Sequence, residues 1–299
     1  MTRLGLTGRF LFGLLRIQRT PATIAPALSG YYIAGSSDLM HLALLALTVL
    51  FLHISGSVIN DIADFNTDKI NHPDRLIVSG VITKRQATIL SLALISFALL
   101  FAVMIDWLFF VLVATIGLIL ELSYSFGVTL KDKPIGSALY LSLGTATIPF
   151  LGGFIISRNL NLTAVLLALF LAIFTSSSIV GSLKDVYGDN QANKRTIAVA
   201  LGEARARQFI HRAVLIPIFL YPFIWKLFGF SQTYLIYASI PIAIRLLISY
   251  IILKPKPLER IHRSKLDEPR ILNRILIVVE FLILALAKPG SGLPWLYPV

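Results

Sequence analysis

The sequence predicts an all-α integral membrane protein, and three observations support this fold class. Of the 299 residues, 56% are hydrophobic and only 14% are charged, and the mean hydropathy is +0.80. Apolar stretches long enough to cross a bilayer recur along the chain. Lys and Arg are concentrated in alternate segments between these stretches. We therefore expect a single transmembrane domain over residues 1–299.

Nine apolar stretches are candidates for membrane-spanning helices. They occupy residues 20–36, 41–62, 87–105, 107–126, 137–157, 161–183, 208–229, 232–253 and 271–287. The segment before the first of them does not resemble a secretory signal. Its apolar run Leu11–Leu15 is short and is followed by Arg16 and Arg19 rather than by a small-residue cleavage site.

The placement of Lys and Arg predicts the orientation in the membrane. With the N-terminus in the cytoplasm, 23 of the 27 Lys and Arg residues fall in cytoplasmic segments. The opposite side contains only Arg158, Lys226 and Lys288, and Arg245 lies within a helix. This positive-inside distribution accounts for the net charge of +12 without nucleic acid as a partner. The absence of Cys excludes disulfides and thiolate metal sites.

Acidic residues gather at the ends of two apolar stretches. They are Asp61, Asp64 and Asp68, preceded by Asn60, at the end of the second stretch, and Asp185 with Asp189 after the sixth. On a helix, residues four apart share a face, so each motif presents a pair of carboxylates. Clustered carboxylates repel one another unless a cation lies among them, and oxygen ligands in a wet site favour Mg²⁺. Both motifs are expected on the cytoplasmic face.

An internal repeat relates the two motifs. Asp64 and Asp68 superpose on Asp185 and Asp189 with an offset of 121 residues. Each pair is followed by a basic loop, a glycine and the basic start of the next apolar stretch. We expect two four-helix repeats in parallel, followed by one added helix.

Cations flank both acidic motifs. They are Lys69, His72 and Arg75 after the first, Lys184, Lys194 and Arg195 around the second, and Lys131 and Lys133 between the fourth and fifth stretches. Carboxylates alone would suit cation transport or a proton relay. Carboxylates interleaved with cations suit an anionic ligand that carries metal. A Mg²⁺-diphosphate is such a ligand, because Mg²⁺ bridges its oxygens to Asp while Lys and Arg neutralise the remaining charge.

These motifs resemble the signatures of the UbiA superfamily of intramembrane prenyltransferases. The segment from Asn60 to Arg75 is similar to the first signature, and Lys184–Asp189 with Lys194-Arg195-Thr196 is similar to the second. The segment from Tyr124 to Lys131 resembles an intervening Tyr/Lys element. Two positions depart from the pattern: Leu76 replaces a common Pro, and Ser182 stands where many members have another Asp.

The resemblance implies nine helices around a central cavity, two Mg²⁺ ions bridged by a prenyl diphosphate, and transfer of the prenyl group to a lipophilic acceptor. The catalytic residues expected from it are Asp61, Asp64, Asp68, Asp185, Asp189 and Lys131. The expected metal ligands are Asn60, Asp64, Asp68, Asp185 and Asp189, with Asp61 orienting a basic partner instead. The diphosphate would be bound by Arg75, Tyr124, Lys131, Lys184 and Arg195.

The acceptor is open at this point. The motifs are most similar to archaeal-type members that alkylate geranylgeranylglyceryl phosphate. An aromatic or quinone-precursor acceptor is the alternative within the family. A cation-coupled transporter or lipid-diphosphate carrier is the alternative outside it, although transporter acids usually lie near the membrane midplane rather than at helix ends. Oligomeric state is not predicted.

Overall fold

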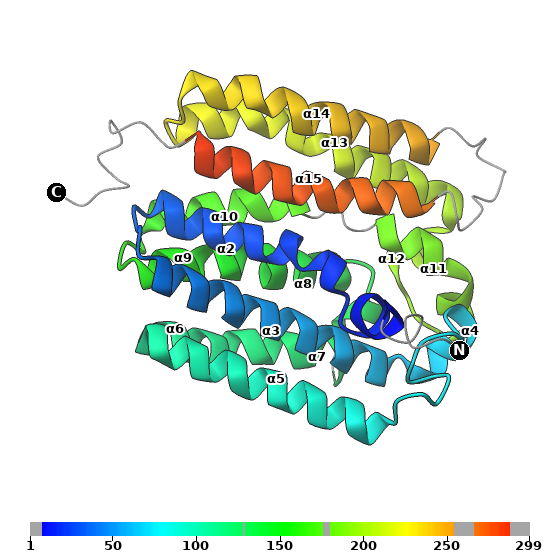
Figure 1. The fold of residues 1–299 in the computed structure, drawn as a ribbon. Helices are drawn as coiled ribbons and strands as arrows, with labels where there is room; N and C mark the ends of the chain where they lie inside the picture. Colours follow the sequence, from blue (N-terminus) through cyan, green and yellow to red (C-terminus); the bar gives the residue numbers. More distant parts are fainter. Residues whose placement is uncertain (1–7, 128, 176–179, 254–265, 288–299) are drawn as a thin grey trace.

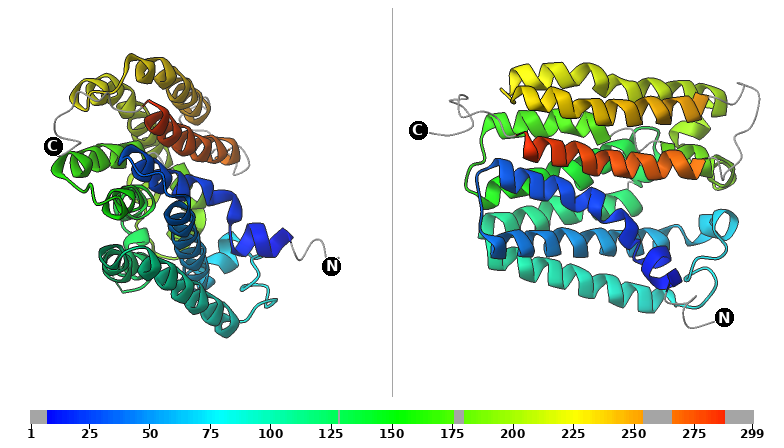
Figure 2. Two further views of the ribbon diagram at one scale, coloured as in Figure 1. Left: turned by 60° about the vertical axis from the view of Figure 1, so that its left-hand side comes forward. Right: turned by 45° about the horizontal axis from the view of Figure 1, so that its top comes forward.

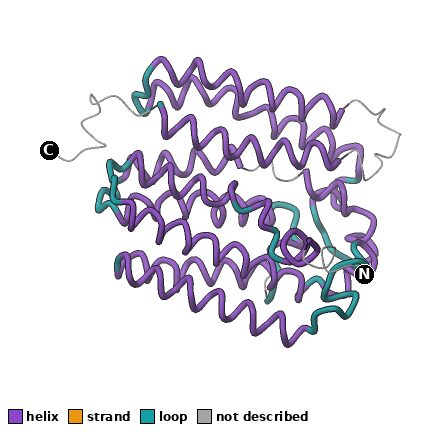
Figure 3. Tube along the Cα trace, viewed as in Figure 1, coloured by secondary structure: helices purple, strands orange, loops and turns teal. Residues whose placement is uncertain are grey.

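The computed structural model describes residues 8–127, 129–175, 180–253 and 266–287, and this part of the chain contains no strand (Figure 3). The predicted all-α class is therefore confirmed. Long helices lie side by side along a common direction (Figures 1 and 2). They include α2 (Pro21–Ile33), α3 (Leu39–Ala63), α5 (Lys84–Ile105), α10 (Leu162–Thr175), α13 (Glu203–Leu227), α14 (Gln232–Leu253) and α15 (Asp267–Leu286).

Two further long helical segments are interrupted by a π-helical turn. α6 (Trp107–Leu112) passes through Val113–Gly117 into α7 (Leu118–Ser125). Likewise, α8 (Gly136–Ser142) passes through Leu143–Thr147 into α9 (Ile148–Ile156). Such turns are rare, and they are frequent at functional sites.

The short elements gather at one end of the bundle. They are α4 (Phe65–Asn71), α11 (Val180–Gln191) and α12 (Ile197–Leu201), together with the π-helical Arg9–Leu14 and the 3₁₀ turns Ile17–Arg19 and Leu130–Asp132. At the opposite end the connections are shorter (Figures 1 and 3). There, the Asp106 carboxylate accepts hydrogen bonds from the amides of Leu108 and Phe109 and caps α6 directly after α5.

Six helical segments of the described chain are long and apolar enough to cross a membrane, which makes this a multi-pass membrane protein. They are Leu39–Ala63, Lys84–Ile105, Trp107–Ser125, Gly136–Ile156, Glu203–Leu227 and Gln232–Leu253. α2 is too short at 13 residues, α10 has only 14, and α15 carries five charged residues. Nine spans and a four-helix repeat stay predictions.

Glycines allow α2 and α9 to pack backbone against backbone. A Cβ atom at Gly30 would lie 2.0 Å from the carbonyl oxygen of Phe150, and one at Gly153 would lie 2.2 Å from the amide nitrogen of Tyr31. Small residues permit this close approach between membrane helices. The contact fixes α2, and with it the arginines that directly precede α2.

A buried ion pair joins α13, α14 and α15. Arg245 is 0% exposed and Glu280 is 3% exposed. Arg245 Nε donates to Glu280 Oε1 at 3.1 Å, and Tyr221 Oη donates to the same oxygen at 2.6 Å. Arg245 Nη1 also donates to the carbonyl oxygen of Val214 at 3.2 Å. The partners compensate a charge that would otherwise be very costly in an apolar interior.

We expect Glu280→Ala to lower the free energy of unfolding by about 3–5 kcal/mol, because it leaves the Arg245 charge buried and unpaired. Unfolding of the purified protein in detergent measures this loss. Leu247→Ala, at a 47% exposed position on α14, is the control and should cost much less. The Arg245→Met/Glu280→Leu double variant should recover most of the stability. Equal losses for Glu280→Ala and the control would contradict a stabilising role for the pair.

Candidate active site

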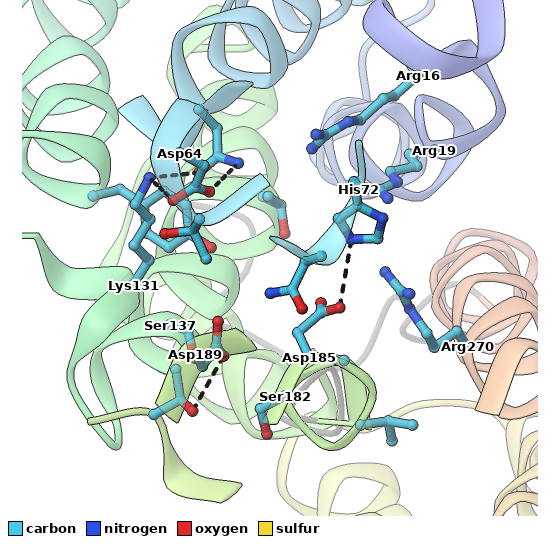
Figure 4. A pocket seen from close by; sticks show the side chains of 18 of the residues that line it. Arg16, Arg19, Asp64, His72, Lys131, Ser137, Ser182, Asp185, Asp189 and Arg270 are labelled. Atoms are coloured by element: carbon cyan, nitrogen blue, oxygen red, sulfur yellow. Dashed lines mark hydrogen bonds and ion pairs between the residues drawn. The ribbon is translucent and has the colours of Figure 1, made fainter. Parts of the chain in front are cut away.

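One cavity of about 360 Å³ lies at the end of the bundle where the short helices gather, and both acidic motifs line it. Asn60, Asp64 and Asp68 of the first motif contribute to its lining, as do Asp185 and Asp189 of the second. The structure thus brings together side chains that lie more than 120 residues apart in the sequence. Figure 4 shows Asp64 facing Asp185 and Asp189 across this space.

Asp64 is the centre of the first motif. It lies between the end of α3 and the start of α4, where Asn60 Nδ2 donates to its Oδ2 at 3.0 Å. Its Oδ1 is 2.9 Å from Lys131 Nζ and 2.7 Å from Lys194 Nζ. Lys131 Nζ also donates to Asn60 Oδ1 at 3.1 Å. Three separate chain segments therefore meet at one carboxylate.

Asp61 and Asp68 share a different cation. Arg75 Nη1 is 2.9 Å from Asp61 Oδ1 and also pairs with Asp68. Asp61 pairs in addition with Arg16, is only 2% exposed, and does not contribute to the cavity lining. In this arrangement Asp61 contacts two arginines, Arg16 and Arg75.

The second motif lies on α11. Asp185 Oδ1 is 3.4 Å from His72 Nε2, and Asp189 Oδ2 accepts a hydrogen bond from Thr196 Oγ1 at 3.3 Å. Gly188 allows α11 to approach α4, because a Cβ atom there would lie 2.1 Å from Asn71 Oδ1. The glycine between the two carboxylates therefore helps to bring the second motif against the first.

The carboxylates differ in their electrostatic environment. Burial raises the pKa of Asp68 to about 6 despite the opposing effect of Arg75, and burial also raises the pKa of Asp189 to about 6. Burial acts on Asp64 in the same direction, but Lys131 and Lys194 outweigh it, so its pKa lies below the usual value. The ionised forms of Asp68 and Asp189 are thus disfavoured, and added positive charge in the cavity would stabilise them.

Two predicted diphosphate ligands do not contribute to this cavity. Lys184 pairs with Asp267 of α15 and lines a separate hollow beside α12. Arg195 donates its backbone amide to the carbonyl oxygen of Asp132 at 3.0 Å and is absent from the lining. Lys194, which was noted only as a flanking cation, lines the cavity and contacts Asp64.

Arginines form another part of the lining that sequence reasoning missed. They are Arg16 and Arg19 before α2, and Arg270 and Arg274 on α15. The i, i+4 spacing of Arg270 and Arg274 was a usable signal, since residues at that spacing share a helix face. The sequence does not indicate that the face of α15 with Arg270 and Arg274 packs near the start of α2.

A largely apolar cavity of about 170 Å³ adjoins the acidic one and shares lining residues with it, including Arg16, Arg19, Asn60 and Tyr124. Most of its other lining residues are apolar and include Val49, Leu52, Phe109, Val113, Leu120, Ile148 and Pro149, whereas Thr48 and Ser57 contribute hydroxyl groups. Both π-helical turns contribute to it, through Gly117 and Gly144. The Tyr124 ring stacks on Tyr140 with their centres 4.0 Å apart.

Two polar residues whose roles a sequence cannot decide also line the apolar cavity. Glu121 Oε2 accepts a hydrogen bond from Tyr140 Oη at 2.6 Å, so this acid has a structural partner. His53 Nδ1 is 3.1 Å from Thr23 Oγ1, and its Nε2 has no hydrogen-bond partner in the described part of the chain. His53 lines both cavities and so marks the passage between them.

The donor set fits a hard divalent cation that arrives with an anionic ligand. The lining acids offer only oxygen ligands, the kind that Mg²⁺ prefers. Within the described residues, no three acidic or histidine side chains are grouped closely enough to hold a metal ion by themselves. Instead, Asp64 forms ion pairs with Lys131 and Lys194, and Asp68 forms one with Arg75. Additional oxygens from a ligand such as a diphosphate would complete the coordination.

Comparisons with known proteins identify the family of this chain. The chain matches the UbiA prenyltransferase family over residues 23–273. It is similar to the digeranylgeranylglyceryl phosphate synthase of Natronomonas pharaonis, with 29% identity over 230 residues that cover 76% of this chain and 82% of the relative. The enzyme of that name from Saccharolobus solfataricus is 30% identical over 229 residues, covering 75% and 79%.

The fold also has a solved counterpart. A UbiA homologue from Archaeoglobus fulgidus, bound to DMAPP and Mg²⁺, superposes with a TM-score of 0.71 and 19% sequence identity, covering 91% of this chain and 98% of that chain. The family match spans most of the sequence and includes both acidic motifs. This protein therefore belongs to the UbiA prenyltransferase family and is a membrane-embedded prenyltransferase.

Proposed function

We propose that the protein transfers a prenyl group from a prenyl diphosphate, such as geranylgeranyl diphosphate, to geranylgeranylglyceryl phosphate in archaeal-type lipid synthesis. The observation that carries this proposal is the meeting of both acidic motifs with Lys131 and Lys194 in one cavity that opens into an apolar one. The relatives named digeranylgeranylglyceryl phosphate synthase support the choice of acceptor.

In this proposal, two Mg²⁺ ions are held by Asn60, Asp64, Asp68, Asp185 and Asp189. When bound, Mg²⁺ takes up negative charge that develops on the diphosphate as the carbon–oxygen bond breaks. Lys131, Lys194 and Arg75 bind the remaining diphosphate oxygens. In the ligand-free chain the same cations neutralise Asp64 and Asp68, so binding exchanges partners within a site that is already electrostatically balanced.

The apolar cavity accommodates the prenyl tail. Its side chains exclude water from the allylic cation that forms when diphosphate leaves. Tyr124 lines both cavities, so in this proposal its side chain lies where the prenyl tail meets the diphosphate. The ring face stabilises positive charge by a cation–π interaction.

The proposal includes the membrane arrangement inferred from the charges. Nine helices span the bilayer as two four-helix repeats plus one helix, and the N-terminus and the acidic cavity face the cytoplasm. The clustering of α4, α11 and the start of α15 at one end of the bundle supports a common side for the basic loops (Figure 1).

The activity test uses the purified protein in vesicles with labelled geranylgeranyl diphosphate and Mg²⁺. Geranylgeranylglyceryl phosphate should be alkylated, and Asp64→Ala or Asp185→Ala should each reduce the rate about a hundredfold or more, because each removes several kcal/mol of charge stabilisation. Asp74→Ala, an exposed acid between the motifs, is the matched control. Alkylation of 4-hydroxybenzoate alone would establish the aromatic alternative, and movement of label across the membrane without any product would establish a carrier.

The positions of the lysines give a separate prediction for binding. Lys194→Ala should weaken an uncleavable prenyl-diphosphate analogue by roughly tenfold or more, because it removes a charge-assisted hydrogen bond. Lys184→Ala should have little effect, because Lys184 pairs with Asp267 outside the cavity. Titration with the analogue and with the corresponding prenyl alcohol separates diphosphate binding from tail binding. The assignment fails should both variants behave alike, or should Lys194→Ala weaken both ligands equally.

Sidedness is testable because the chain contains no Cys. A single Lys133→Cys variant should react with an impermeant thiol reagent only from the cytoplasmic side. Ser37→Cys, in the exposed connection between α2 and α3, should react only from the opposite side. Labelling of position 133 from outside intact cells would reverse the proposed orientation.

A further inference from the structure

Three arginines line the acidic cavity away from the predicted diphosphate ligands. We call Arg19, Arg270 and Arg274 the arginine wall. Arg19 ends the 3₁₀ turn before α2, whereas Arg270 and Arg274 lie one turn apart on α15. Figure 4 shows Arg19 and Arg270 on the opposite side of the cavity from Asp64 and Lys131.

The arginine wall differs from the other cations of the site in its acidic neighbours: Asp267 attracts Arg274, but without an ion pair. Arg16 pairs with Asp61, and Arg75 pairs with both Asp61 and Asp68. In the part of the chain that the structure describes, no ion pair joins Arg19, Arg270 or Arg274 to a carboxylate. The Nε atom of Arg19 is also buried without a hydrogen-bond partner among these residues.

Grouping these charges is unfavourable by itself. Burial lowers the pKa of Arg19 well below its usual value, and Arg16, Arg274 and Arg270 add repulsion. Buried donors normally have partners, and like charges held together normally have a counter-ion. A bound anion would supply a hydrogen-bond acceptor for Arg19 Nε and would reduce the repulsion among the arginines. These two features therefore indicate an anionic ligand.

The ligand is distinct from the diphosphate in position and in charge balance. Asp64 and Asp68 already bring Lys131, Lys194 and Arg75 to the other side of the cavity. Three more guanidinium groups exceed what one diphosphate with its metal ions requires. The planar guanidinium binds two oxygens of a phosphate at once, which makes arginine the preferred residue for this group.

An apolar groove lies beside the arginine wall and is separate from the acidic cavity. The groove, of about 730 Å³, runs along α2 and α15, the same two helices that place the arginine wall. Ile17 lines this groove, and Arg16 and Arg19 on either side of it in the 3₁₀ segment line the cavity. A molecule with a phosphate head and an apolar tail would contact both surfaces.

We propose that the arginine wall binds the phosphate of a phosphorylated lipid acceptor and holds it across the cavity from the prenyl diphosphate. The inference rests on the proposed function for its substrate, and it assigns acceptor specificity to Arg19, Arg270 and Arg274. A neutral acceptor would leave the wall without a counter-ion.

The kinetic test uses the full-length protein in phosphatidylcholine vesicles. The acceptors are geranylgeranylglyceryl phosphate and geranylgeranylglycerol, which lacks the phosphate. Arg270→Gln and Arg274→Gln should each raise KM for the phosphorylated acceptor about tenfold, leave KM for the prenyl diphosphate nearly unchanged, and leave use of geranylgeranylglycerol unchanged. Arg270→Lys should restore part of the loss. Arg205→Gln, an exposed arginine on α13 outside the cavity, is the matched control.

Three results would overturn the assignment. An equal rise in KM for the prenyl diphosphate would place the arginines in the diphosphate site. An equal loss for both acceptors would make their role structural. The third result is loss of binding of the phosphorylated acceptor in vesicles that contain an equimolar amount of phosphatidylglycerol. The wall would then recognise lipid headgroups in general.

A binding measurement separates this inference from the proposed function. Thermal stabilisation of the wild-type protein by geranylgeranylglyceryl phosphate, but not by geranylgeranylglycerol, requires no turnover. Its loss in Arg19→Gln would support the phosphate subsite even where no alkylated lipid forms, in which case only the proposed function fails. Alkylation of both acceptors with equal efficiency by the wild type would support prenyl transfer but overturn the arginine wall as the phosphate subsite.

Discussion

The structure depends on neutralising buried carboxylates at one end of a helical bundle. Asp64 is the clearest case, because its charge is balanced by Lys131 from the α7–α8 connection and by Lys194 from the segment after α11. Neither cation is near Asp64 in sequence. The ion pairs of Asp64 therefore hold three chain segments together around the cavity. An unpaired buried charge there would cost several kcal/mol. Ion pairs between these acids and distant cations therefore stabilise the fold at this end of the bundle.

The apolar part of the bundle determines where this cluster lies. Gly30 and Gly153 allow α2 and α9 to touch, and Gly188 allows α11 to approach α4. The acidic cavity lies at the end of the bundle where the short helices gather, and the apolar cavity adjoins it. A charged and an apolar compartment that share Asn60 and Tyr124 suit a substrate with one ionic and one hydrocarbon end.

The sequence predicts the elements of this fold better than its tertiary contacts. Apolar runs locate the long helices, and the shared side of the two acidic motifs follows from the number of stretches between them. The role of Lys184 could not be predicted in the same way. It directly precedes Asp185 on α11, so the helix turns it by about 100° from that carboxylate, and it meets Asp267 instead. The sequence also could not predict that Arg270 and Arg274 of α15 line the cavity, because only the packing of α15 on α2 places them near Arg19.

The asymmetry of the two motifs has a physical explanation in these contacts. Asp61 and Ser182 are counterparts in the internal repeat, yet Asp61 points to Arg16 and Arg75 and contributes nothing to the cavity lining. Its carboxylate serves to hold arginines that the first motif needs. The second motif has no arginine in an equivalent ion pair among the described residues, and Ser182 lines the cavity directly. A carboxylate at 182 would add negative charge beside Asp185. A hydroxyl at this position avoids that repulsion.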